Sequence, residues 1–136
     1  MTSLIPPRVL RFIVRHLRST VDLEVLILVG TTPDRGWNAG MVATELGIPG
    51  ASARESLEHL CRKNLLDVKV GETLRYRFNP GTPNLGRTVD ELMTTYREAR
   101  VAVTAAVTDA ARQRLRDFAD AFRVLDVEED EDNNGG

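Results

Sequence analysis

The sequence predicts a mainly helical domain that carries one small β-hairpin. Three observations predict it. Apolar residues recur at helical spacing through most of the chain, the period switches to two between residues 66 and 78, and a heptad-like spacing begins at Leu85. With 136 residues, 42% of them hydrophobic, the chain is long enough to build one hydrophobic core.

Residues 1–20 are predicted to form a basic N-terminal helix. Pro6 and Pro7 suit the first helical turn. Residues at i, i+3, i+4 and i+7 then form an apolar stripe, namely Leu10, Ile13, Val14 and Leu17. A basic stripe runs beside it, formed by Arg8, Arg11, Arg15 and Arg18.

A second helix is predicted from Val21 to about Thr31. The five consecutive apolar residues at 25–29 would also fit a strand, but Asp22 and Glu24 favour a helix because acids stabilise a helix N-terminus. Residues 33–36 have the composition of a turn. We expect Trp37, which follows this turn, to pair briefly as a strand residue and to pack in the core.

Two short helices joined by a tight turn come next. Asn38 is a good N-cap and Gly47 a good C-terminal stop for the first of them. The second is predicted over 52–64, because Ser52 and Glu55 have the spacing of a capping box. We expect its inner face to consist of Ala53, Leu57, Leu60 and Cys61.

A hairpin is predicted over 66–78, with its turn at Gly71-Glu72. The alternation predicts one apolar face that points inward, formed by Leu66, Val68, Val70, Leu74, Tyr76 and Phe78. Between them stand Asp67 and the basic residues expected to point outward, which are Lys69, Arg75 and Arg77. Residues 79–84 are predicted to be a loop.

Residues 85–125 are predicted to be a helical dimerisation region. Spacings of four and three produce a heptad seam of Leu85, Val89, Leu92, Tyr96, Ala99, Val103, Ala106 and Ala110. This seam exceeds what a small domain needs for its own core, so we expect a homodimer in addition to intrachain packing. The phase shifts near Thr108 and Asp109, where a second helix is expected to begin, with a stripe of Leu115, Phe118, Ala119 and Phe122.

The charges are segregated along the chain. Residues 1–20 hold four Arg and no acid, whereas residues 126–136 hold six acids and no base, and the whole chain has a net charge of −2. The acidic tail offers little to bury, so residues 126–136 are predicted to be disordered. The single Cys61 excludes an intrachain disulfide, and no apolar run could span a bilayer, so we expect a cytoplasmic protein without a membrane partner.

Residues 37–80, WNAGMVATELGIPGASARESLEHLCRKNLLDVKVGETLRYRFNP, resemble the bacterial winged helix-turn-helix domains of MarR-like transcription regulators and their relatives. The resemblance implies a winged helix-turn-helix over 21–80, followed by long C-terminal helices. It further implies that helix 52–64 enters the major groove of double-stranded DNA while hairpin 66–78 touches the backbone. The implied DNA-binding residues are Ser52, Arg54, Glu55, Glu58, His59, Arg62, Lys63, Lys69, Arg75 and Arg77.

Glu55 and Glu58 on the expected DNA-binding face, together with a sequence pI of about 5.7, oppose strong binding to a polyanion. A second function therefore stays open, that of a protein-interaction module whose acidic helix face or acidic tail binds a basic protein partner. No catalytic motif, metal-binding spacing or cofactor motif is found, so no enzyme activity, metal or cofactor is expected.

Overall fold

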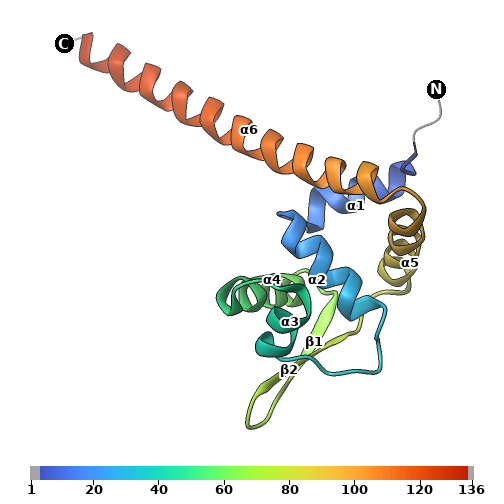
Figure 1. Cartoon of the computed structure of the whole chain (residues 1–136). Helices are drawn as coiled ribbons and strands as arrows, with labels where there is room; N and C mark the ends of the chain where they lie inside the picture. The colour runs from blue at the N-terminus through green and yellow to red at the C-terminus, as the bar shows by residue number, and fades with distance from the viewer. Residues whose placement is uncertain (1–3, 135–136) are drawn as a thin grey trace.

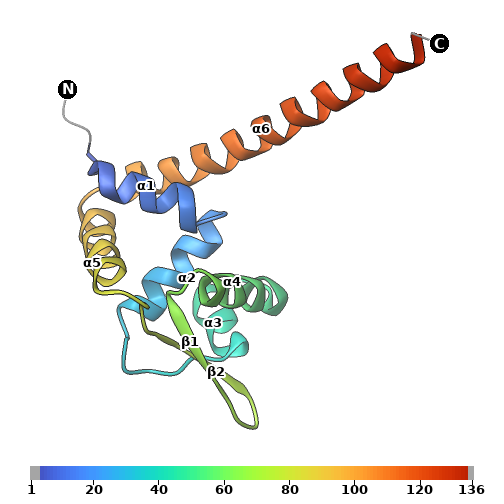
Figure 2. The same cartoon turned by 180° about the vertical axis from the view of Figure 1, so that it is seen from behind.

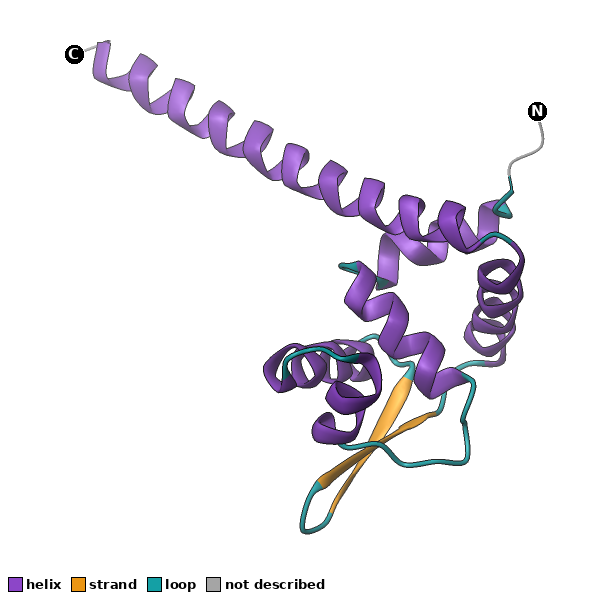
Figure 3. Ribbon diagram, viewed as in Figure 1, coloured by secondary structure: helices purple, strands orange, loops and turns teal. Residues whose placement is uncertain are grey.

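The computed structural model describes residues 4–134, with side chains described through Val124. These residues form six helices and one two-stranded antiparallel sheet (Figures 1 and 3). The predicted fold class, mainly α with a small hairpin, is confirmed. In chain order the elements are α1 (Pro7–His16), α2 (Thr20–Gly30), α3 (Ala39–Leu46), α4 (Gly50–Arg62), β1 (Leu66–Val70), β2 (Leu74–Phe78), α5 (Pro83–Glu98) and α6 (Arg100–Asn134).

Helix α2 lies at the centre of the molecule and packs against α3, α4, α6 and β2. A helix that is apolar on most of its faces is stable in water only when other elements surround it. The Ser19 side chain caps α2 by accepting a hydrogen bond from the backbone N–H of Asp22, at 3.3 Å. The prediction of a helix here, and not a strand, is confirmed.

Helix α1 packs against α5 and α6, but its buried face differs from the predicted one. Val9, Phe12 and Ile13 are buried, whereas Val14 is 56% exposed. The buried stripe is therefore rotated by about one residue from the stripe expected through Leu10 and Val14. Phe12 explains the rotation, because the burial of this aromatic ring outweighs that of a valine.

The two short helices form, and α3 begins and ends as predicted, whereas α4 spans Gly50–Arg62 in place of the predicted 52–64. Asn38 accepts a hydrogen bond from the backbone N–H of Met41 at 2.8 Å, and Gly47 ends α3 with a φ of 65°. Helix α4 begins at Gly50, so the prediction that Ser52 caps it is wrong. Pro49 occupies the N-cap position in an extended conformation, with a φ of −61° and a ψ of 144°, and no side chain caps the helix.

The predicted hairpin forms, with Leu66 opposite Phe78 and Val70 opposite Leu74, so residues 71–73 connect the strands instead of the predicted two-residue turn at Gly71-Glu72. Trp37 pairs with Tyr76 through two backbone hydrogen bonds of 2.7 Å, which confirms its brief strand pairing. Only the base of the hairpin is buried, because the strands project beyond the helices (Figure 1). The expectation that all six apolar side chains point inward is therefore wrong for the outer half of the hairpin.

Helices α5 and α6 meet at Ala99, whose φ of −142° and ψ of 55° end the first of them. The predicted break near Thr108 is wrong. The bend lets the buried faces of both helices reach the same core, so Val89, Leu92 and Val103 are fully covered within one chain. The prediction that these three residues form a dimer seam is therefore wrong.

Beyond residue 114, α6 extends away from every other element (Figures 1 and 2). The helix continues through Asn134, which differs from the expected disordered tail at 126–136. Adding residues to an existing helix is much easier than starting one, and Glu has a good helix propensity. Residues 135–136 of that predicted tail lie outside the described residues.

Candidate nucleic-acid interface

The outward face of α4 carries most of the residues predicted for major-groove contact. Their side chains reach solvent from one helix face and from the residue after its end, and they are Arg54, Glu55, Glu58, Arg62 and Lys63. Ser52 is half-buried within the first turns. The opposite face of α4 packs Ala53, Leu57 and Leu60 into the core, at 0% exposure each.

His59 is not part of this outward face, so its prediction as a DNA-binding residue is wrong. The ring is 8% exposed, and its Nε2 lies 2.8 Å from the backbone carbonyl oxygen of His16. A carbonyl oxygen only accepts hydrogen bonds, so Nε2 carries a proton and donates it. This hydrogen bond instead connects α4 to the end of α1.

The hairpin presents the three predicted basic side chains to solvent. Lys69 and Arg75 are paired across the strands, and Arg77 lies opposite Asp67, so all four residues share one face. Arg75 Nη1 lies 2.9 Å from the sulfur of Met41, so this arginine folds back over α3. Lys69 and Arg77 are exposed.

The other face of the hairpin tip is apolar and open. Val68, Val70 and Leu74 are 41%, 82% and 44% exposed. At the base of the same face Tyr76 is buried, and burial together with the nearby Glu58 raises the pKa of its phenol. The charged outward face of α4 and the apolar tip of the hairpin are therefore both exposed to solvent.

Sequence reasoning missed a buried polar network that joins α1, α2 and α4. The Asp22 carboxylate is fully buried and accepts hydrogen bonds from the backbone N–H of Arg18 at 2.8 Å and from its guanidinium at 3.0 and 3.1 Å. The Ser56 hydroxyl, 2% exposed, donates to the same carboxylate at 2.7 Å. The sequence signal for this network is an acid next to a long apolar run, because a carboxylate at such a position must find buried hydrogen-bond donors.

The pKa values in this network follow from burial and from its hydrogen bonds. Burial acts to raise the pKa of Asp22, but the hydrogen bonds from Arg18 and Ser56 outweigh it and leave the pKa below its ordinary value. The Asp22 carboxylate is thus held ionised. Burial lowers the pKa of both His16 and His59, and their neighbouring cations add to that shift.

Trp37 and Cys61 have structural roles in the described part of the chain. Trp37 is 2% exposed and donates from Nε1 to the Thr32 hydroxyl at 3.0 Å, while the Arg35 guanidinium lies 4.0 Å from its ring centroid. The core position predicted for Trp37 is confirmed. Burial and the nearby Asp67 raise the pKa of the half-buried Cys61, so the thiol is not activated as a nucleophile.

The basic stripe of α1 is not continuous with the basic face of the hairpin. Arg8 pairs with Glu91 at 2.9 Å, and Arg18 is held by Asp22. Helix α1 lies beside α6, at the end of the molecule opposite the hairpin tip (Figures 1 and 2). Contacts of this stripe with the same DNA segment as the hairpin are therefore not supported by the geometry.

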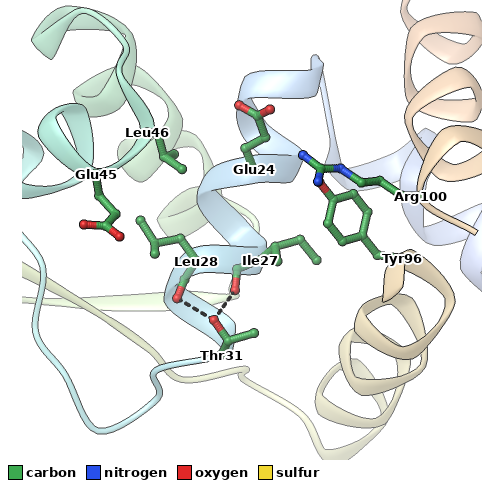
Figure 4. A pocket seen from close by; sticks show the side chains of 8 residues that line it. All are labelled: Glu24, Ile27, Leu28, Thr31, Glu45, Leu46, Tyr96 and Arg100. Carbon is green, nitrogen blue, oxygen red and sulfur yellow. Dashed lines mark hydrogen bonds between the residues drawn. The ribbon is translucent and has the colours of Figure 1, made fainter. Parts of the chain in front are cut away.

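A cavity of about 390 Å³ opens between α2, the end of α3 and the junction of α5 with α6 (Figure 4). Ile27, Leu28 and Leu46 supply apolar surface, and Arg100 lies over the Tyr96 ring at 5.5 Å from its centroid. Glu24, Thr31 and Glu45 complete the lining. Among residues 4–124, no group of three His, Cys, Asp or Glu side chains is arranged to hold a metal ion.

The described helices include none with both the length and the apolar character needed to cross a membrane. Central α2, the α3–α4 pair and the adjacent hairpin together define a winged helix-turn-helix domain, with α1, α5 and α6 at the end opposite the hairpin tip.

No protein-family model matches the chain, and no curated protein sequence matches it. A solved structure of a mutant of ZitR from Lactococcus lactis is similar with a TM-score of 0.50 and 12% sequence identity, covering 81% of this chain and 74% of ZitR. A second ZitR mutant structure has a TM-score of 0.48 at 12% identity, covering 80% and 73%. At this identity the likeness supports the fold alone.

Proposed function

We propose that this chain is a homodimeric, DNA-binding transcription regulator in which α4 enters the major groove and the hairpin follows the backbone. The observation that carries the proposal is the joint exposure of basic side chains on α4 and on the adjacent hairpin of a winged helix-turn-helix fold. An exposed helix beside a basic hairpin can place donors at base edges and cations at phosphates in one binding event.

Arg54 is the residue we assign to base recognition. It is exposed in the first half of α4, and its guanidinium can donate two hydrogen bonds to one guanine. Arg62, Lys63, Lys69 and Arg77 are assigned to phosphates, which supply affinity without sequence information. Glu55 and Glu58 repel phosphates, but a carboxylate can accept a hydrogen bond from the amino group of cytosine. These two acids therefore favour discrimination between sequences over strong general affinity.

Dimerisation is assigned to the outer half of α6, instead of the seam first predicted. Leu115, Phe118 and Phe122 are 69%, 71% and 58% exposed, and their spacing places them on one helix face. No other described element covers this face (Figure 2). Large apolar side chains exposed in a row indicate a protein contact, and a second copy presents the same complementary stripe. Two α4 helices about 34 Å apart would then meet successive major grooves.

The test begins with a selection of preferred sites from a random duplex DNA library, followed by affinity measurements over a range of salt concentrations. Arg54→Ala is expected to cost about 1–3 kcal/mol on the selected site and to relax its sequence preference. Lys69→Gln with Arg77→Gln is expected to weaken all duplexes and to reduce the salt slope by about 2, because two phosphate contacts disappear.

Arg116→Ala is the matched control, because it removes one exposed charge from α6 at the far end from the hairpin. It should leave DNA affinity unchanged. If the wild-type protein binds no duplex in a salt-dependent way, or if Arg116→Ala weakens binding as much as Arg54→Ala, the assignment of this face to DNA is wrong.

A second candidate function is favoured by the apolar hairpin tip. Val68, Val70 and Leu74 are open to solvent beside the acids of α4, and such a surface suits a protein partner with apolar and basic groups. Deletion of residues 126–136 separates the two roles. Tighter DNA binding after the deletion supports regulation of DNA binding by the acidic segment, whereas loss of a protein partner with unchanged DNA binding supports the interaction module.

A further inference from the structure

A small basic cleft lies where the ends of α1 and α4 approach the side of α6. Its volume is about 210 Å³, and Val14 and Leu17 supply its apolar surface. The remaining lining residues are all cationic or can become so, namely Arg15, His16, Arg18, His59, Lys63 and Arg114. They come from α1, α4 and α6, from Lys63 directly after α4, and from Arg18 in the connection between α1 and α2, so only the tertiary fold brings them together.

Arg114 is fixed at this cleft by the end of α1. Its guanidinium donates to the backbone carbonyl oxygens of Leu17, Arg18 at 3.3 Å and Val14 at 3.5 Å. No backbone N–H of α1 donates to these carbonyl oxygens, and an arginine is a favourable partner for them. The guanidinium carries five N–H donors in total, so donors remain for a ligand in the cleft.

The other cations differ in how far their charge is already balanced. Arg18 is paired with the buried Asp22. Arg15 and Lys63 are exposed, and neither forms an ion pair with a carboxylate among residues 4–124. The described lining of the cleft contains no acid, so the unbalanced charge of Arg15, Lys63 and Arg114 is concentrated around one small space.

We propose that this cleft binds a small oxoanion of the phosphate class, held by Arg15, Lys63 and Arg114. Three cations from α1, α6 and the residue after α4 surround a space large enough for one such group. Arginine and lysine donors form charge-assisted hydrogen bonds with phosphate oxygens. The bound anion reduces the repulsion among the cations and connects the end of α4 to α6.

Binding is expected to strengthen as the pH falls. His16 and His59 face the cleft from α1 and α4, and a bound anion favours their protonated forms. The charged groups packed around them are Arg15 and Arg18, Asp22 of α2, Glu55 of α4, Lys63 and Arg114 of α6. Among these, Asp22 and Glu55 are the acids, and Asp22 is already committed to Arg18 and Ser56.

The test is a titration of the full chain with inorganic phosphate, followed by calorimetry and by thermal unfolding at constant ionic strength set with chloride. We expect one phosphate per chain and a raised unfolding temperature. Arg15→Gln with Arg114→Gln should weaken phosphate binding by about tenfold or more, because two charge-assisted contacts are lost, and neither residue belongs to the face assigned to DNA. The control Arg11→Gln removes an exposed charge from α1 outside the cleft and should leave the affinity unchanged.

The same variants distinguish a free anion from a phosphate of the DNA backbone. If the double variant binds duplex DNA like the wild type but loses inorganic phosphate, the ligand is a free anion, and this holds whether or not DNA is the protein's target. If it loses both, with a salt slope reduced by about 2, the cleft accepts DNA phosphates. If the wild type binds no phosphate and the double variant leaves the DNA salt slope unchanged, the proposal is wrong. It is equally wrong if Arg11→Gln has the same effect as the double variant. Far-UV circular dichroism without phosphate checks that each variant is folded.

Discussion

Asp22→Ala is predicted to destabilise the fold more than any surface substitution in this chain. The substitution removes the acceptor on which Ser56 and Arg18 both depend. The Ser56 hydroxyl is 2% exposed and would be left without its partner, which costs about 1–3 kcal/mol. The backbone N–H of Arg18 also loses its acceptor, at a cost of about 1 kcal/mol.

The charge pair itself adds little to that total. The Arg18 side chain is 45% exposed, so its guanidinium can turn to water once the carboxylate is gone. The expected loss in unfolding free energy is therefore about 2–4 kcal/mol. For a domain of this size the unfolding temperature falls by roughly 3–4 °C per kcal/mol, so we expect a decrease of about 6–15 °C.

A double-mutant cycle with Ser56→Ala tests the reasoning by urea unfolding. In the Asp22→Ala background, removing the Ser56 hydroxyl removes the unsatisfied group, so the double variant should lose about 1–2 kcal/mol less than the two single losses combined. Asp34→Ala, which removes an exposed acid from the turn after α2, is the control and should stay within about 0.5 kcal/mol of wild type. Additive losses, or an Asp22→Ala loss as small as the control's, would refute the network's role.

Asp22→Ala is also predicted to change how the stability of the fold depends on pH. The pKa of Asp22 is lower in the folded protein than its ordinary value of 3.8, so the unfolded chain takes up this proton first as the pH falls. The stabilisation is complete above pH 3.8 and is lost as the pH falls through the lower, folded-state pKa. Asp22→Ala should therefore show a shallower loss of stability than wild type on acidification below that pH.

Three further predictions concern other parts of the chain. Burial lowers the pKa of His59 below 6.5, so the stability of the wild-type protein should fall as the pH drops below 6.5. His59→Gln should reduce that loss of stability, as measured by urea unfolding at two pH values. Gly47→Ala should cost about 1 kcal/mol, since φ is 65° and the new methyl group meets no neighbour within 4 Å; a cost near zero would mean that α3 ends differently. Val89→Ala should lower unfolding free energy by about 2 kcal/mol and leave dimerisation unchanged, whereas Phe118→Ser should weaken dimerisation and leave stability unchanged, as measured by sedimentation and urea unfolding.

The helix ends and the hairpin were predictable because their signals are local. Asn38 caps α3 with its own side chain, and Gly47 supplies the left-handed conformation at the other end. The alternation over 66–78 predicts the two strands and their pairing, although the connection is one residue longer than the predicted turn at Gly71-Glu72. Each of these features depends on residues within a few positions of one another, so the sequence is sufficient to predict it.

The bend at Ala99 was not predictable in this way. Alanine favours helix, and neither Gly nor Pro is present to mark an end. The heptad spacing continues through the bend because both helices bury a stripe, but they bury it against α1 and α2 of the same chain. The heptad spacing indicates that a helix face is covered, but it does not indicate whether the same chain or a second copy covers it. The exposed stripe at Leu115, Phe118 and Phe122 supplies that information only once the fold is known.

The site prediction failed at His59 for a related reason. Helical spacing places His59 between the core face and the solvent face of α4, and the sequence does not reveal that the end of α1 lies against this edge. The carbonyl oxygen of His16 provides an acceptor there, and Asp22 and Arg18 lie alongside. Polar residues at such an edge are assigned to solvent, or to DNA, unless the tertiary neighbour is known.

The buried network makes the position of α4 depend on residues far from its outward face. Arg114 of α6 holds the carbonyl oxygens at the end of α1, Arg18 reaches from there to Asp22, and Asp22 accepts the hydroxyl of Ser56 on α4. Each of these contacts joins two different helices, or a helix and the connection between α1 and α2. A shift of α4 relative to α1 would therefore break a hydrogen bond to a buried carboxylate, which is costly when its donors have no other partner. The face that we assign to DNA and the helix that we assign to dimerisation are thus connected by polar contacts of fixed geometry, and an anion in the adjacent cleft would strengthen that connection.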